Sequence, residues 1–265
     1  MGHRYRHSWA PVSGATVDAA FAVGAAAAFG VGSPATSGLA QRIRAAGIPF
    51  VPGASPEEEL VELLRVAAEI EHGLLVEYLY AAYSCQSPTI AAAIATIAKQ
   101  EMGHLITVQN VLLMMGAEPY LGRQDATVGP SGDPFPFGLE RISLDSLAKY
   151  TMCESPADPE VHPDLQAALA DARIRAAAAT PFLNRVGALY AKIYWLLMKD
   201  DVDVDVWAGF PTHLFLPAEA GRHVRQGAAS DALRQATPEE WGGSVPGLIV
   251  RTCENTALGR QAIFA

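Results

Sequence analysis

Residues 94–111, IATIAKQEMGHLITVQNV, form the centre of a helical pattern in which two polar side chains stand where apolar ones are expected. Apolar residues recur at alternating steps of four and three, the stripe that a bundle helix turns toward its neighbours. Glu101 and His104 lie in this stripe, one turn apart. We expect the helix to begin at Ser87-Pro88 and to stop at Gly116. The stripe consists of Ile90, Ile94, Ile97, Glu101, His104, Val108, Val111 and Met115.

The segment before it predicts a second long helix, which ends at about Ser84. Ser55 is a good N-cap, Pro56 suits the first helical position, and Glu58 completes a capping box. This helix also carries a stripe with one carboxylate in its middle, Glu71. The stripe consists of Leu60, Leu64, Ala67, Glu71, Leu74, Tyr78 and Ala81.

The three polar residues of these stripes predict a metal site. A carboxylate in a dry core is costly unless it is paired, protonated or bound to a metal. A Glu-x-x-His pair places a carboxylate and an imidazole side by side, as in di-iron carboxylate bundles. Oxygen and imidazole donors suit iron or manganese, and the lack of a nearby thiolate disfavours a structural zinc site. We therefore expect Glu71, Glu101 and His104 to bind a metal; a buried acid paired with an arginine is the structural alternative.

Glycine and proline divide the rest of the chain into shorter helices and long connections, so the predicted fold class is all-α. The expected shorter helices span about residues 143–154, 164–178 and 181–199, and a last helix follows Pro246 to the C-terminus. Long loops are expected at 120–142 and 200–245. Residues 202–206, VDVDV, are the one strand-like segment.

Residues 1–54 are rich in glycine, alanine, serine and proline and differ in composition from the rest of the chain. We expect an extended arm here, lying on a helical domain that spans residues 55–265. A basic start and a short apolar run resemble a signal peptide, but Asp18 and several glycines interrupt that pattern.

Composition excludes several classes of protein. Of 265 residues, 50% are hydrophobic and 18% charged, so the chain has enough apolar material for a packed core. Its formal net charge of −9 argues against nucleic acid and anionic membrane surfaces as partners. No stretch is apolar enough to span a bilayer. Three widely spaced cysteines (Cys85, Cys153 and Cys253) fit a reducing compartment, so we expect a cytoplasmic protein.

Several motifs together resemble the ferritin-like domain of the iminophenylpyruvate dimer synthase family, enzymes of bisindole pathways such as violacein and rebeccamycin. The resemblance covers about residues 48–200 and implies a four-helix bundle with a non-haem iron site between its helices. The motifs are Glu69-Ile70-Glu71-His72, Tyr78-Leu79-Tyr80-Ala81-Ala82-Tyr83-Ser84, Glu101-Met102-Gly103-His104 and Met115-Gly116-Ala117-Glu118-Pro119.

The second half of the implied site departs from the family pattern. Such sites draw carboxylates from all four long helices, but residues 180–199 contain no acid, and Ala188 stands where the related pattern has a glutamate. The last expected helix has one acid, Glu254, and no Glu-x-x-His. Either that half is lost, or Glu154, Glu254, His213 or His223 rebuild it. A single ion and an asymmetric pair both remain open, and His72, which points elsewhere, is expected to be structural.

The resemblance and the metal pattern together imply a non-haem iron or manganese oxidoreductase. We expect it to act with dioxygen or peroxide on a small, amino-acid-derived substrate in secondary metabolism, and to be a homodimer. Long loops would form a substrate pocket that a storage ferritin does not need. The alternatives are a metal-poor ferritin-like binding or scaffold protein and a metal storage protein.

Overall fold

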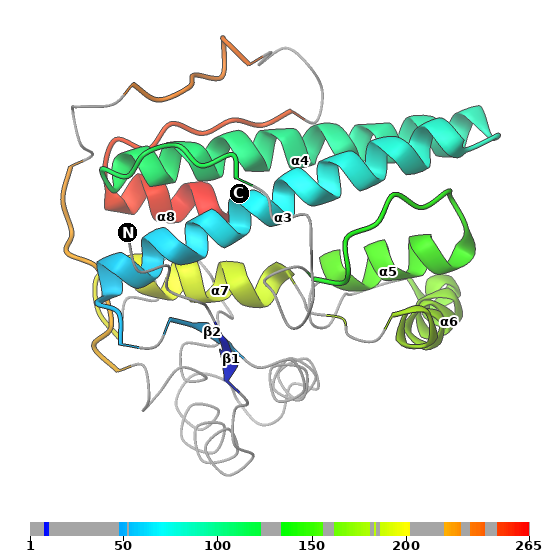
Figure 1. Cartoon of the computed structure of the whole chain (residues 1–265), viewed down its shortest axis with the longest axis horizontal. Helices are drawn as coiled ribbons and strands as arrows, with labels where there is room; N and C mark the ends of the chain where they lie inside the picture. The colour runs from blue at the N-terminus through cyan, green and yellow to red at the C-terminus, as the bar shows by residue number, and fades with distance from the viewer. Residues whose placement is uncertain are drawn as a thin grey trace.

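The regular secondary structure of the described residues consists of helices and two short strands (Figure 1). The computed structural model describes residues 8–10, 48–51, 53–122, 134–155, 162–180, 183, 186–201, 220–228, 234–241 and 248–264. The elements are β1 (Ser8–Ala10), β2 (Ile48–Phe50), α3 (Pro56–Ser84), α4 (Pro88–Met114), α5 (Leu144–Glu154), α6 (Pro163–Ala179), α7 (Val186–Leu197) and α8 (Thr256–Phe264). The predicted all-α fold class is confirmed. None of the described helices is both long enough and apolar enough to cross a membrane.

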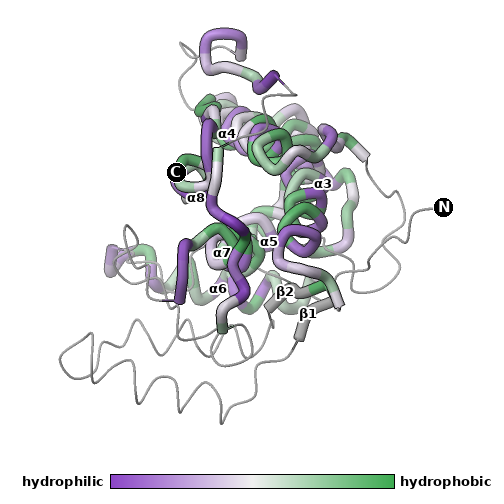
Figure 2. Tube along the Cα trace, turned by 90° about the vertical axis from the view of Figure 1, so that its left-hand side faces the viewer, coloured by the Kyte–Doolittle hydropathy of each residue, from purple (hydrophilic) through white to green (hydrophobic). Residues whose placement is uncertain are grey.

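Helices α3, α4, α7 and α8 form the bundle. Figure 2 shows these four around a common centre. α3 packs most extensively on α4, α7 contacts both α3 and α8, and α8 also lies on α4. The strand β2 pairs antiparallel with β1 and contacts α7 and α3 of this bundle.

Local sequence signals account for the two long helices. Ser55 Oγ accepts a hydrogen bond from the Glu58 backbone N–H at 3.3 Å, and Glu58 Oε2 accepts from the Ser55 N–H at 2.9 Å, so the predicted capping box is confirmed. Ser87 caps α4. That helix ends at Met114, and Gly116 follows with φ +75°, a conformation that favours glycine. Every predicted stripe residue of α3 is buried.

The predicted stripe of α4 is only half right. Ile94, Glu101, Val108 and Val111 are buried, but Ile90 is 46% exposed and Ile97 42%. The reason is helix length: α4 has 27 residues, whereas α8, which packs on it, has 9 and covers only part of it. In Figure 1 the C-terminal end of α3 and the N-terminal end of α4, which a short connection joins, project beyond the bundle.

Two predicted helix starts are corrected. α7 begins at Val186 rather than near residue 181. α8 begins at Thr256 rather than after Pro246, because Asn255 supplies the cap: its Oδ1 accepts from the Leu258 N–H at 2.9 Å. Residues 248–253 instead run along α4, where Thr107 Oγ1 accepts from the Arg251 N–H at 3.1 Å. The strand-like segment 202–206 lies outside the described residues.

A buried ion cluster fixes α7 against α3. Glu59 Oε2 accepts from Arg222 at 2.6 Å, and Glu59 Oε1 lies 3.4 Å from the fully buried Lys192 Nζ. The Val51 N–H also donates to Glu59 Oε1, at 3.1 Å. The register of α7, and therefore the position of every side chain that it directs toward the bundle centre, is set by this cluster.

Candidate metal centre

Three predicted donors meet between α3 and α4. One ligand atom from each of Glu71, Glu101 and His104 lies within 4.8 Å of the other two. His104 Nδ1 is 3.1 Å from Glu101 Oε2, one turn before it on α4, and 3.5 Å from Glu71 Oε2 across the helix interface. The Glu71 and Glu101 side chains are 1% and 4% exposed, whereas His104 is 51% exposed. The cluster is therefore buried on its carboxylate side and open at the imidazole.

The close packing of two carboxylates and an imidazole shifts the pKa values of the cluster. Burial raises the pKa of Glu101 to about 8; the hydrogen bond from His104 opposes this rise, and the charge of Glu71 adds to it. Burial disfavours the charged form of His104, but its hydrogen bond with Glu101 and its charge interactions with both carboxylates are stronger and raise its pKa to about 11. A bound cation could take the place of these protons.

The donor set fits a divalent ion. Glu71 Oε2 is buried and accepts no hydrogen bond from the described residues, so this oxygen is available to a ligand. Of the described residues, His104 is the ion-pair partner of both carboxylates, and neither carboxylate pairs with an arginine or lysine there. The structural alternative, a buried acid paired with arginine, therefore finds no support. Two carboxylates and an imidazole are donors that iron and manganese accept.

Tyr190 joins the cluster from α7. Its hydroxyl donates a short hydrogen bond to Glu71 Oε1, the second oxygen of that carboxylate. Burial raises the pKa of Tyr190 well above the ordinary tyrosine value, and the charge of Glu71 adds to the effect, so the hydroxyl keeps its proton and acts as a donor. The third bundle helix, which has no acid, thus contributes a phenol to the cluster.

Glu154, the last residue of α5, lies beside the cluster but outside the three-donor group. Tyr78, on α3, donates to Glu154 Oε1 at 2.8 Å. Although Glu154 is an exposed residue, desolvation of its carboxylate beside the protein and the charge of Glu101 raise its pKa to about 7, against the opposing hydrogen bond from Tyr78.

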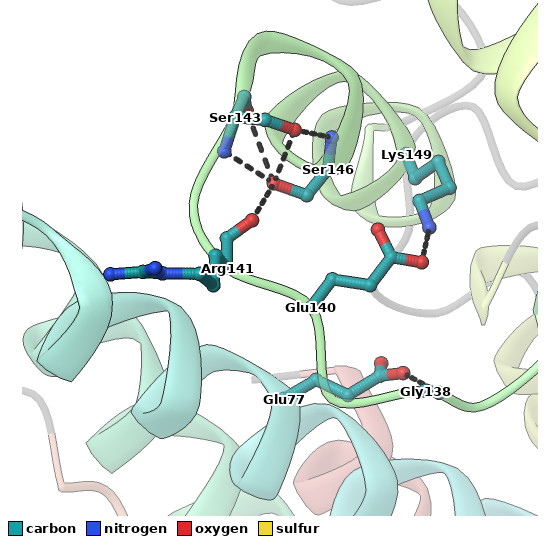
Figure 3. A network of polar contacts seen from close by, with 7 residues as sticks. All are labelled: Glu77, Gly138, Glu140, Arg141, Ser143, Ser146 and Lys149. Carbon is teal, nitrogen blue, oxygen red and sulfur yellow. Dashed lines mark hydrogen bonds and ion pairs between the residues drawn. The ribbon is translucent and has the colours of Figure 1, made fainter.

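A polar network holds α5 in this position (Figure 3). Glu77 on α3 accepts from the Gly138 N–H at 2.8 Å, which fixes the segment leading into α5. Lys149 on α5 pairs with Glu140 at 2.5 Å. Ser143 caps the helix by accepting from the Ser146 N–H at 3.0 Å. These contacts place the C-terminal end of α5, and hence Glu154, next to Tyr78.

The structure does not bring the other candidates into the cluster. Glu254 is exposed in the bend before α8, so the last helix presents no acid to the bundle. His223 instead contacts Asp201 through Nε2 at 2.7 Å and the Trp195 carbonyl through Nδ1 at 2.9 Å. His72 is not part of the donor group. His213 lies outside the described residues.

Two tyrosines that the sequence pattern did not mark as site residues reach the cluster and the acid beside it. Tyr78 and Tyr190 are packed in the core or against it, and their hydroxyls bind Glu154 and Glu71 respectively. One feature of the sequence points to Tyr190. The third bundle helix contains no acid, so it has few polar side chains that could reach Glu71 at the bundle centre.

Comparison with known proteins agrees with this geometry. The sequence profile of the Ferritin-like family matches residues 64–204, more than half of the chain, including α4, α7 and most of α3. The chain belongs to the Ferritin-like family. No curated protein and no solved structure matches it. Membership of this family accounts for the helical bundle.

Proposed function

We propose that this ferritin-like protein is a non-haem metal-dependent oxidoreductase with iron, or manganese, held by Glu71, Glu101 and His104. The observation that carries the proposal is the buried Glu71 Oε2, which accepts no hydrogen bond from the described residues and faces His104 Nδ1. A bound ion would supply redox chemistry with dioxygen or peroxide that side chains lack.

The chain's own residues would do the rest. Glu71 and Glu101 would balance the charge of a divalent ion in the buried half of the site, and Tyr190 would keep Glu71 in one orientation through its hydrogen bond. His104, half exposed, marks the side from which small molecules reach the site. Glu154, with a pKa raised to about 7, is suited to hold or release a proton near neutral pH at the edge of the site.

The substrate class follows from the motif resemblance to iminophenylpyruvate dimer synthases. We propose a small, amino-acid-derived imine in secondary metabolism, with dioxygen or peroxide as co-substrate. The residues expected to form the substrate pocket fall largely in loops 120–142 and 200–245, of which the structure describes residues 120–122, 134–142, 200–201, 220–228 and 234–241. A homodimer in the cytoplasm is the proposed working form.

Metal analysis tests the proposal. We expect the protein, reconstituted anaerobically with ferrous iron and desalted, to retain iron, and Glu101→Gln and His104→Ala to lose it while keeping their helical circular dichroism. Glu118→Gln is the matched control, an exposed glutamate just beyond α4 that should change nothing. Less than a tenth of an equivalent in the parent protein would instead favour a metal-poor scaffold. Loading with very many ions per chain would favour storage.

An oxygen electrode then tests the reaction class. We expect the iron-loaded protein to consume dioxygen faster when an α-imino acid, formed in solution from an α-keto acid and ammonia, is present. Glu101→Gln should abolish the stimulation. Iron retention without any stimulation would leave the metal site standing but overturn the proposed substrate class.

A further inference from the structure

We propose that the site binds one metal ion rather than two, and that Tyr190 positions Glu71 as a one-oxygen ligand of that ion. The inference rests on the proposed metal site and concerns how Tyr190 positions Glu71. It starts from the short hydrogen bond that the Tyr190 hydroxyl donates to Glu71 Oε1.

The hydrogen bond from Tyr190 gives the two oxygens of Glu71 different surroundings. Oε1 is taken by Tyr190, whereas Oε2 faces His104 Nδ1 and accepts no hydrogen bond from the described residues. A carboxylate that bridges two ions in the usual way uses both of its oxygens. The hydrogen bond from Tyr190 occupies one acceptor site of Oε1 and orients the carboxylate so that Oε2 is the oxygen presented to an ion, which favours a one-oxygen ligand over a bridge. Hydrogen bonds of this kind fix the orientation of a metal ligand and change its affinity.

The other polar side chains of α7 are engaged elsewhere. Lys192 pairs with Glu59 at 3.4 Å. The Tyr194 ring lies under Arg260 of α8, and the Trp195 ring contacts His223. Tyr190 is therefore the described side chain through which this helix reaches the cluster.

α8 adds no donor for a second ion. Its residues, Thr256–Phe264, include neither an acid nor a histidine, and its one charged side chain is the cation Arg260. The remaining acid near the cluster, Glu154, is bound to Tyr78 and lies outside the group of donors.

Charge balance also favours a single metal ion. Glu71 and Glu101 together carry two negative charges, which neutralise one divalent ion in a buried site. A second divalent ion would leave a net charge of two, or of one if Glu154 took part, and uncompensated charge is costly in the interior. Two carboxylates and one imidazole on one side of a single ion would leave its other positions open to small molecules.

Manganese provides a spectroscopic test that does not depend on activity. We expect the metal-free full-length protein to bind one equivalent of Mn²⁺ by elemental analysis, with the six-line electron paramagnetic resonance spectrum of an isolated ion. Two equivalents with a spin-coupled spectrum would overturn the single-ion inference and leave the proposed metal site intact. No binding of Mn²⁺ or Fe²⁺ would overturn both.

Tyr190→Phe tests the role of the hydroxyl. It should weaken Mn²⁺ binding by about 10- to 100-fold, the range seen when a hydrogen bond to a metal ligand is removed, and should alter the zero-field splitting of the bound ion. Tyr194→Phe, one turn further along α7, is the control and should change neither. Unchanged affinity and splitting in a folded Tyr190→Phe protein would overturn the assignment of Tyr190 as a positioning residue.

Discussion

The carbonyl oxygen of Ile249 lies only 2.5 Å from the point that a Cβ atom on Gly103 would occupy. Gly103 sits between Glu101 and His104, so the segment that runs along α4 at Ile249 packs against the turn that carries two of the candidate metal ligands. Glycine is required here by close approach of two backbones, because any side chain would displace one of them.

Gly103→Ala should therefore destabilise the protein, by about 1–3 kcal/mol for an overpacked site, and weaken metal binding as the turn shifts. Urea unfolding and metal titration measure the two effects. Gly187→Ala in α7 is the control: nothing lies within 4 Å of its Cβ position, so alanine should be neutral or slightly stabilising. Equal stability of the two variants would contradict the close packing of residue 249 on α4.

The metal-free protein should lose stability as pH rises. The pKa of Glu101 is raised from 4.5 to about 8 and that of His104 from 6.5 to about 11, so the folded state holds both protons more tightly than the unfolded state. For Glu101 the stabilisation is complete below pH 4.5 and disappears as pH approaches 8.

The comparison with Glu101→Gln isolates this effect. We expect the melting temperature of the metal-free parent protein, relative to that of the variant, to fall steadily between pH 5 and about pH 8, the range given by the Glu101 shift. Saturating metal should remove the trend, because the ion replaces the protons. A difference that grows with pH would show that Glu101 is not held protonated in the folded chain.

The Glu59 cluster should be a strong determinant of stability. Glu59→Ala removes the carboxylate that contacts both Arg222 and the fully buried Lys192, and breaking a buried pair in this way costs about 3–5 kcal/mol. Arg222→Ala should cost less, since the Arg222 side chain is partly exposed and Lys192 keeps its partner. Chemical denaturation of both variants checks this order, and the reverse order would contradict the role of this cluster in fixing α7.

The exposed side of α4 is expected to form the homodimer interface. Ile90 and Ile97 are two turns apart on it, and residues 88–98 contain no charged side chain, so two copies can meet here without repulsion although each chain carries a net charge of −9. Ile97→Glu should convert a dimer to a monomer in analytical ultracentrifugation. Ile174→Glu, an exposed site on α6, should not. A dimer that survives Ile97→Glu would place the interface elsewhere.

Local signals predicted most of what lies within one helix. Ser55 and Ser87 define the starts of α3 and α4, and the stripes bring Glu71, Glu101 and His104 together, because these features depend on neighbours along the chain. Features that depend on contacts with other helices could not be predicted from the sequence. Ile97 is exposed because α8, which packs on α4, is short, and a lone tyrosine such as Tyr190 gives no sign of which carboxylate its hydroxyl will meet.

The start of α8 illustrates the same limit. Pro246 and Asn255 are both reasonable helix starts, and only the contacts of residues 248–253 with α4 decide between them. The start at Thr256 leaves Glu254 outside the helix and thus outside the set of side chains that face the bundle. The N-terminal arm and the domain boundary at residue 55 stay predictions.

Anomalous diffraction at the iron edge, on crystals of the iron-reconstituted protein, tests the central claim most directly. We predict a single peak between α3 and α4, bounded by Glu71, Glu101 and His104, and its loss in His104→Ala crystals grown in the same way. A map without a peak there, with those three side chains still clustered and iron present in the crystal, would contradict the metal site on which this function depends.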